Sequence, residues 1–380
     1  MLDLTRLAAA RPVFDAHADS LQLALDLGRD LGSAGPGHLD LVRGRAGGLG
    51  ALVFVSWCDP KFLAAGEHGA RERTRGLLRE FHRLARRHPE QVSFAGNAQA
   101  LDAAHRRGAV AGIPGIEGGH SIEDSLDELE WFFARGVRVM TLVWNNHLRW
   151  IRSCQDGAGA EIPEGLSDFG RGVVRRMNEL GMVVDLSHAG RRSFFDALDA
   201  TTKPAIASHS GCMAVNEHPR NLDDEQLRAL ARNGGVVGIV FCTPFLDAAA
   251  RAEEHRWRET PEYKALRGTN DTDLFLAQCE FLQRSVTPLP LERVLDHLCH
   301  AVEIAGIEHV GIGSDYDGIQ RTPQGLEDAS TYLALAAGMA RRGFGAADIE
   351  AVLGGNMRRV YASVTAPGTA AATSALVPME

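Results

Sequence analysis

Residues 13–19, VFDAHAD, form a short apolar run that ends in His17 and Asp19. Four other apolar runs carry such a residue at or near their ends: Glu117 in VAGIPGIEGGH (110–120), His188 in MVVDLSH (182–188), His209 in PAIASH (204–209) and Asp315 in HVGIGSDYDG (309–318). Apolar runs of this length are typical of buried strands. A carboxylate or imidazole at the same end of each run indicates parallel strands that share a metal site at their carboxyl-terminal edge.

Strand-like and helix-like segments alternate along the chain. Eight apolar runs are predicted strands, at 13–17, 51–57, 109–117, 137–144, 182–186, 205–208, 236–240 and 310–314. Predicted helices lie between and after them, at 72–88, 101–107, 125–134, 167–180, 191–200, 223–233, 291–305, 326–341 and 346–353. Ser167 and Asp223 suit helix starts, and Gly181 and Gly306 suit helix ends. This pattern favours an α/β fold, a (β/α)8 TIM-like barrel of the metal-dependent hydrolase type, over an open sheet.

The chain of 380 residues suits one barrel with insertions. We therefore predict a single catalytic domain over residues 1–362. Its longest stretch without a clear strand, 245–287, is expected to form helices or a lid over the barrel mouth. The small and polar residues 363–380 are expected to form a loose tail.

Composition excludes several classes of protein. The net charge of −9 argues against a nucleic-acid partner, and no apolar run is long enough to span a membrane. The sequence has no nucleophile elbow of the G-x-S-x-G type and no phosphate-binding glycine motif. Six scattered cysteines, with no signal-peptide core before the first predicted strand, lead us to expect a cytoplasmic protein with free thiols.

The strand-end residues have the chemistry of a two-ion site. His17 and Asp19 are two residues apart, so both side chains lie on one face of a strand and chelate one ion. His188 and His209 end consecutive strands and suit a second ion. Glu117, followed by two glycines, has two carboxylate oxygens and can bridge both ions. A carboxylated-lysine bridge is disfavoured because Lys203 alone lies near a strand, before its start.

A pair of divalent ions holds a hydroxide at neutral pH and polarises a carbonyl, which is the chemistry of amide or ester cleavage. Asp315 and Asp317 follow the last strand, and we expect one of them, Asp315, to transfer the proton to the leaving group. Arg220 in HPRN (218–221) suits a substrate carboxylate. An ion pair between Arg220 and Asp223 or Asp224 at the helix entry explains its position equally well.

Several longer motifs occur in order: DAHADS (15–20), GIEGGHSI (115–122), GLSDFGRGVVRRMNELGMVVDLSHAG (165–190), PAIASHSGC (204–212), HPRN, HVGIGSDYDG and LGGNMRRV (353–360). Together they resemble the membrane (renal) dipeptidase family of zinc peptidases, in a soluble bacterial-type form. The resemblance covers roughly residues 12 to 360. It implies a TIM-like barrel that holds two Zn²⁺ per subunit, cleaves dipeptides and often accepts a D-residue on the C-terminal side.

The resemblance also implies roles for individual residues. His17 and Asp19 bind the first zinc ion, His188 and His209 bind the second, and Glu117 bridges them. Asp315 is the acid/base, and Arg220 holds the C-terminal carboxylate of a small peptide substrate. Many members of the family are homodimers, so we expect a homodimer.

Two positions depart from the mammalian members of this family. Trp144 stands where they have a substrate-contacting histidine, and His147 is a possible substitute, although a changed pocket is the simpler interpretation. Cys242 stands where they have a substrate-contacting tyrosine. We expect Trp144 and Asn145 to contact the substrate, in a wall that the neighbours Trp150 and Asn146 complete.

The sequence thus leads to a binuclear zinc dipeptidase that hydrolyses L-L and L-D dipeptides by a metal-bridging hydroxide. The departures at Trp144 and Cys242 motivate an alternative, a metal-dependent amidohydrolase that acts on a modified peptide or an N-acyl amino acid. A third hypothesis, a metal-binding scaffold without turnover, is disfavoured because every expected ligand and the acid/base are present.

Overall fold

The computed structural model describes residues 3–64, 69–155, 162, 164–366 and 379. Its strands form one parallel sheet in the order β2-β1-β9-β8-β7-β6-β5-β4-β3, which the pairing of β2 with β4 closes into a barrel. The strands are β1 (Val13–Ala18), β2 (Leu49–Trp57), β3 (Val92–Phe94), β4 (Val110–Glu117), β5 (Val139–Thr141), β6 (Val183–Asp185), β7 (Ile206–Ser210), β8 (Val236–Ile239) and β9 (Val310–Ile312).

The barrel confirms the predicted fold class. The eight strands of the closed ring, all except β3, overlap the eight predicted strands. The closing pair β2–β4 is continuous in register from Ala51↔Ala111 to Trp57↔Glu117. The additional strand β3 extends the sheet beside the first residues of β4. Its three residues are too short to show a strand period, so the sequence did not reveal it.

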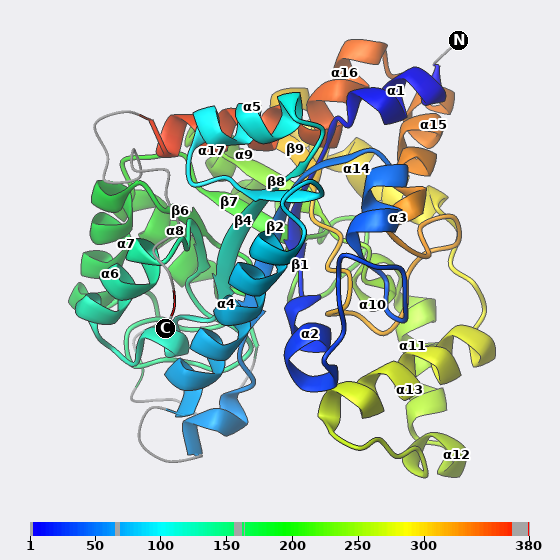
Figure 1. Cartoon of the computed structure of the whole chain (residues 1–380), viewed down its shortest axis with the longest axis horizontal. Coiled ribbons are helices and arrows are strands. Elements are labelled where there is room, and N and C mark those ends of the chain that lie inside the picture. The colour runs from blue at the N-terminus through cyan, green and yellow to red at the C-terminus, as the bar shows by residue number, and fades with distance from the viewer. Residues whose placement is uncertain (1–2, 65–68, 156–161, 163, 367–378, 380) are drawn as a thin grey trace.

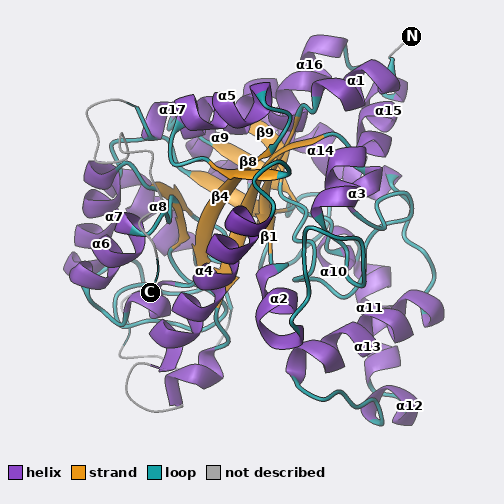
Figure 2. Cartoon of the chain, viewed as in Figure 1, coloured by secondary structure: helices purple, strands orange, loops and turns teal. Residues whose placement is uncertain are grey.

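Helices surround the strands (Figure 2). The α-helices are α1 (Leu4–Ala10), α2 (Leu21–Leu27), α3 (Leu41–Ala46), α4 (Gly69–Arg87), α5 (Ala98–Arg106), α6 (Leu126–Ala134), α7 (Asp168–Leu180), α8 (Arg191–Ala200), α9 (Asp224–Arg232), α10 (Thr243–Leu246), α11 (Ala248–Arg258), α12 (Pro261–Lys264), α13 (Asp271–Ser285), α14 (Glu292–Ala305), α15 (Leu333–Arg341), α16 (Ala346–Glu350) and α17 (Asn356–Val364). The predicted caps are confirmed: the Ser167 and Asp223 side chains accept hydrogen bonds from the first turns of α7 and α9.

The last helices differ from the prediction. The segment predicted as a helix from residue 326 becomes α-helical only at Leu333, because the Tyr316 hydroxyl donates to the carbonyl oxygens of Leu326 and Asp328 and holds this stretch against the barrel. The predicted helix 346–353 continues through a π-helical turn, Ala351–Gly355, into α17. A Cβ on Gly354 would lie 2.1 Å from the Pro12 carbonyl oxygen, so glycine permits this close contact with β1.

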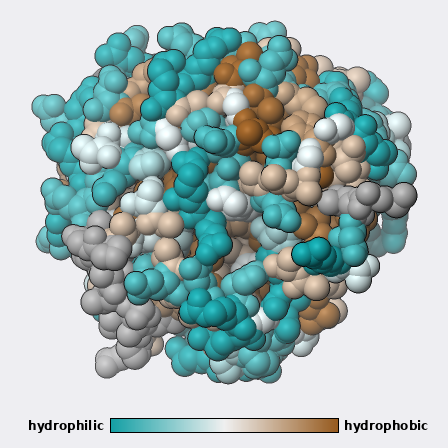
Figure 3. Space-filling model, turned by 90° about the horizontal axis from the view of Figure 1, so that it is seen from above, coloured by the Kyte–Doolittle hydropathy of each residue, from teal (hydrophilic) through white to brown (hydrophobic). Residues whose placement is uncertain are grey.

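Helices α5 and α17 cover the amino-terminal end of the barrel (Figure 1). Side chains of both helices pack with the first residues of the strands in one buried apolar cluster, which includes Phe14, Leu101 and Tyr361. The molecular face on this side carries mainly hydrophilic residues with hydrophobic ones dispersed among them (Figure 3). This end is therefore filled, and the opposite, carboxyl-terminal end holds the polar strand-end residues.

The segment 245–287 contributes the second half of α10 and all of α11, α12 and α13. The start of α13 is tied to α2, since Asn270 donates to the Asp26 carbonyl oxygen at 3.1 Å. Most of the predicted tail 363–380 lies outside the described residues, and its first two residues end α17. Within the part of the chain that the structure describes, no helix has the length and apolar character that a membrane crossing requires.

The close packing of strands at Gly238 predicts that a larger residue at this position destabilises the barrel. A Cβ at this position in β8 would lie 2.0 Å from the Ser208 carbonyl oxygen and 3.0 Å from the Gly313 nitrogen, both backbone atoms. We expect Gly238→Ala to lower the free energy of unfolding by roughly 1–3 kcal/mol or more, because the strands must move apart. Gly172→Ala in α7, where nothing lies within 4 Å, should raise it by about 1 kcal/mol. Equal urea midpoints for the two variants would contradict this account.

Candidate metal centre and active site

The five predicted metal ligands converge at the carboxyl-terminal end of the barrel. They come from the ends of β1, β4, β6 and β7, and none is more than 6% exposed: His17, Asp19, Glu117, His188 and His209. Parallel strands place their carboxyl ends at one edge of the sheet, so closure of the barrel brings residues far apart in sequence into one cluster.

Glu117 lies at the centre of this cluster. Its Oε1 is 2.8 Å from His188 Nε2 and 3.4 Å from His209 Nε2. Its Oε2 is 3.6 Å from His17 Nε2, which in turn is 3.5 Å from Asp19 Oδ2. The donor atoms therefore form two groups of three that share Glu117, and within each group the ligand atoms lie within 4.8 Å of one another.

The donor set fits two cations. His17 Nε2 and Asp19 Oδ1 are buried and have no hydrogen-bond partner among the described residues. The His188 and His209 Nε2 atoms are only 3.1 Å apart. Two imidazole nitrogens at this distance need a shared proton or a cation between them, and imidazole with carboxylate oxygen is a ligand set typical of zinc.

The buried carboxylates also require compensating positive charge. Burial raises the pKa of Asp19 to about 6, although the His17 ring opposes the shift. Burial likewise raises the pKa of Asp315 well above its usual value; His17 opposes this shift, and Asp19 and Glu117 add to it. Bound cations would remove this repulsion, because opposite charge nearby favours the ionised form of a carboxylate.

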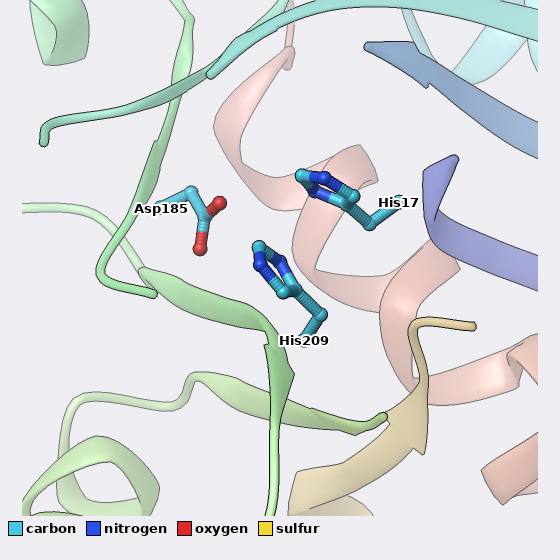
Figure 4. A group of neighbouring side chains, drawn as sticks. All are labelled: His17, Asp185 and His209. Atoms are coloured by element: carbon cyan, nitrogen blue, oxygen red, sulfur yellow. The ribbon is translucent and has the colours of Figure 1, made fainter. Parts of the chain in front are cut away.

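A further buried carboxylate, Asp185 at the end of β6, lies close to His17 and His209 and forms a third possible ligand group with them. Figure 4 shows the Asp185 carboxylate directed toward the two imidazole rings. Its oxygens already accept hydrogen bonds from the Ser187 and Ser208 backbone amides and from the Thr141 and Ser208 hydroxyls. Asp185 is therefore better suited to anchor the site than to bind an ion.

The Ser208 hydroxyl connects Asp185 to the histidine rings. It donates to Asp185 Oδ2 at 2.6 Å, and it lies 2.8 Å from His209 Nδ1 and 3.3 Å from His17 Nδ1. Because a hydroxyl has one proton, Ser208 accepts from the rings, so their Nδ1 atoms carry the hydrogens. This tautomer leaves both Nε2 atoms free to bind metal. Sequence reasoning missed Asp185 and Ser208, although both lie within the quoted strand-end motifs.

Asn145 has a comparable position beside His188. Its Oδ1 is 2.9 Å from His188 Nδ1, which again leaves Nε2 of the ring directed at Glu117. Asn145, which is predicted to contact the substrate, thus lies against the predicted metal ligand His188. It also lines the cavity.

Of the two aspartates after β9, only Asp315 is directed at the centre. Its Oδ1 is 4.0 Å from His17 Nε2. Both aspartates have a left-handed backbone, with φ of 63° at Asp315 and 66° at Asp317. Such a conformation is uncommon for a residue other than glycine and is found preferentially at functional sites. Asp317 is held elsewhere, since its carboxylate accepts hydrogen bonds from the Ser20 hydroxyl and the His38 amide.

Arg220 lies beside the centre and forms no ion pair with an acidic side chain of the residues that the structure describes. It is 3% exposed, and its Nη2 donates to the His209 carbonyl oxygen at 3.3 Å, while Nε has no partner among the described residues. The alternative ion pair with Asp223 or Asp224 is not formed. Asp223 binds Arg191 at 2.8 Å, and Asp224 binds His300 at 2.8 Å. Arg220 is thus available for a carboxylate supplied from outside the chain.

A cavity of about 730 Å³ opens above these residues. Trp144 and Trp57, whose ring centroids are 5.1 Å apart, form one part of its aromatic lining. The expected contribution of Trp150 is wrong: this side chain is 1% exposed and packs in the core against Phe169, because the chain turns inward after Trp144. Trp57, at the end of β2, takes its place and was missed because no polar residue marks that strand end.

The second departure from the mammalian pattern, Cys242, also lines the cavity and is 8% exposed. His147, the possible substitute at the other departure, accepts a hydrogen bond from the Ser153 amide and lines a separate hollow. The changed-pocket interpretation is therefore the one that the geometry favours.

Comparison with known proteins agrees with this site. Residues 2–374 match the sequence profile of the family described as membrane dipeptidase (Peptidase family M19). "Dipeptidase tcpJ" of Claviceps purpurea (strain 20.1) is 32% identical over 351 residues, which are 90% of this chain and 72% of that protein.

Solved structures resemble the chain over almost its whole length. A metallopeptidase from Rhodobacter sphaeroides, crystallised with a phosphinate mimic of the dipeptide L-Ala-D-Ala, has a TM-score of 0.76 and 26% identity and covers 93% of this chain and 99% of its own. The probable dipeptidase PvdM from Pseudomonas aeruginosa, at 22% identity, shares the fold with a TM-score of 0.81 over 95% of this chain and 98% of its own. The chain therefore belongs to the membrane dipeptidase family, peptidase family M19, and is a metallopeptidase that hydrolyses dipeptides.

Proposed function

We propose that the protein is a binuclear zinc dipeptidase. The observation that carries this proposal is the pair of three-residue donor groups that share Glu117. His17 and Asp19 would hold one ion, His188 and His209 the other, and Glu117 both. When bound, two zinc ions supply a hydroxide nucleophile at neutral pH and polarise the scissile carbonyl.

The remaining residues would position the substrate and move the proton. Arg220 has free donor capacity beside the centre and would hold the C-terminal carboxylate of the dipeptide. Asp315, which faces His17, would accept a proton and deliver it to the departing amine. Trp144 and Trp57 would pack against the substrate, and Asn145 would keep His188 oriented.

Dipeptides of both L-L and L-D configuration are the proposed substrates. The structure from Rhodobacter sphaeroides with its L-Ala-D-Ala mimic supports the L-D class. The alternative is an amidohydrolase that acts on a modified peptide or an N-acyl amino acid. A cavity of about 730 Å³ with the small Cys242 in its wall favours it, because this volume exceeds the needs of two small residues.

We also propose the setting of the enzyme. All six cysteines are free, which favours a reducing compartment, the cytoplasm. Residues 1–362 would act as one catalytic domain whose segment 245–287 lines the cavity as a lid. The homodimer stays a prediction, which sedimentation analysis of the purified protein would test.

The proposal predicts turnover that depends on metal. The protein loaded with zinc should bind two ions per chain and hydrolyse a panel of L-L and L-D dipeptides, and chelation should abolish this activity. Asp315→Asn should retain both ions and lose about 10²–10⁴-fold in kcat, since it removes proton transfer. Metal content is measured by elemental analysis and rates by amine release. Full metal occupancy without turnover of any dipeptide would contradict the proposal.

Arg220 separates the two candidate substrate classes. If it binds a free C-terminal carboxylate, Arg220→Ala should lower kcat/KM on simple dipeptides about 100-fold, the value of a charge-assisted bidentate contact. Arg191→Ala, which removes an exposed arginine paired with Asp223, is the matched control and should change little. An unchanged kcat/KM for Arg220→Ala would favour the modified-peptide alternative.

The connection through Ser208 predicts an effect on metal affinity. Ser208→Ala removes the acceptor that fixes the Nδ1 hydrogens of two histidines, so zinc should bind about 10–100-fold more weakly. Competition with a chromogenic chelator measures the affinity, and circular dichroism checks the fold. Ser330→Ala, an exposed serine on the surface, serves as the control. Wild-type affinity in the folded Ser208→Ala protein would show that the hydroxyl does not orient the rings.

A further inference from the structure

The wall of the cavity away from the metal centre contains a second, unexplained polar feature. Glu254 of α11 and Arg321 of the loop after β9 both line the cavity, and each is only 3% exposed. Buried charged groups are ordinarily paired and hydrogen-bonded throughout. Glu254 and Arg321 each have at least one polar atom without a hydrogen bond among the described residues, and two of these atoms face one another.

The hydrogen bonds of Glu254 and Arg321 show which of their polar atoms remain available to a ligand. Glu254 Oε1 accepts a hydrogen bond from Arg258, whereas Oε2 has no hydrogen-bond partner among the described residues. Arg321 donates from Nη2 to the Thr287 carbonyl oxygen at 2.8 Å, whereas its Nη1 and Nε have none within the same part of the chain. Glu254 Oε2 and Arg321 Nη1 are 3.9 Å apart, which is too long for a direct hydrogen bond.

The charges around this gap are balanced. The negative charges of Glu253 and Glu254 stabilise the charged form of Arg321. A second guanidinium, that of Arg258, donates a hydrogen bond to Glu254. A carboxylate entering the gap would meet Glu254 Oε2, and an ammonium would meet Arg321 Nη1. A neutral group with one donor and one acceptor side by side satisfies both atoms, and a carboxamide is the side-chain group with this arrangement.

The gap lies on the side of the cavity where Arg220 lies. Arg220 stacks over the Phe245 ring of α10, with 5.4 Å from its guanidinium carbon to the ring centroid, and α11 follows α10 directly. Cys242, at the start of α10, lines the same cavity as Glu254 and Arg220. A substrate whose carboxylate is held by Arg220 would direct the adjacent side chain into the cavity that Cys242, Glu254 and Arg321 also line.

We propose that Glu254 and Arg321 form a specificity subsite for a carboxamide on the side chain of the C-terminal residue of the substrate. The N–H of the carboxamide donates to Glu254 Oε2, and its oxygen accepts from Arg321 Nη1. This subsite rests on the proposed dipeptidase function and names the substrate class that the enzyme prefers. A site that hydrogen-bonds a substrate group discriminates strongly against analogues without it, because its own buried groups are then left unpaired.

Matched dipeptides test the subsite on the zinc-loaded full chain. Ala-Asn is compared with the nearly isosteric Ala-Leu and with Ala-Asp, and Ala-Gln with Ala-Met and Ala-Glu, each with the same configuration at the second residue. We expect kcat/KM for the carboxamide to exceed both partners by about tenfold or more in the series whose length fits the gap. Reversed dipeptides, such as Asn-Ala and Leu-Ala, should show no such preference.

The variant Glu254→Gln should reduce the carboxamide-to-alkyl ratio to about one, because it places an amide donor where the acceptor stood. Arg284→Gln, on the exposed side of α13, is the control and should keep the wild-type ratio. The subsite would be overturned if the wild-type enzyme showed no carboxamide preference in either series, or showed one only with the reversed dipeptides. Turnover of Ala-Leu would still support the dipeptidase function in that case. Because the wild-type ratio is decisive, the test holds even if Glu254→Gln fails to fold. Absence of all turnover would remove the function on which the subsite depends.

Discussion

Carboxylates and imidazoles are buried together at one end of the barrel, and the surrounding strands and loops must compensate for their charge. Asp19, Glu117 and Asp315 lie within a few ångströms of His17 and are almost inaccessible to solvent. Such a cluster is unfavourable unless positive charge balances it and every other polar atom is satisfied. The arrangement is therefore intelligible only as a site that holds cations, which agrees with membership in a metallopeptidase family.

A layer of polar residues beneath the centre gives the ligands their orientation. Asp185 accepts four hydrogen bonds, two of them from the amide and the hydroxyl of Ser208. The Ser208 hydroxyl also contacts two histidines that belong to different donor groups. Asp15 has a parallel role, since it accepts from Ser314 and from the Tyr332 hydroxyl and thereby ties β1 to the loop that carries Asp315. Because these groups are satisfied by the protein, they hold the ligands without competing for the ions.

Residues 245–287 supply a large part of the cavity lining. Helices α11 and α13 add charged and amide side chains to a cavity that the barrel itself lines with Trp57, Trp144 and the strand-end residues. In the proposed function, the strand-end residues of the barrel would carry out the reaction, whereas this segment and Cys242 would select the side chains of the substrate. Function on a common fold commonly divides in this way between a rigid scaffold and variable connections.

The fold class and the five strand-end residues could be predicted from the order of the residues alone. Periodicity and residue type are local properties, and parallel strands of a closed barrel have only one edge at which such residues can meet. The sequence was silent on β3, on Asp185 and Ser208 as supporting residues, and on Trp57 in place of Trp150. It left open whether Arg220 pairs with Asp223 or Asp224. These depend on side-chain direction and on contacts between distant segments. These contacts form only when the barrel closes and α10–α13 pack at its carboxyl-terminal end. A side chain is hydrogen-bonded or left unpaired according to which residues of distant segments lie next to it.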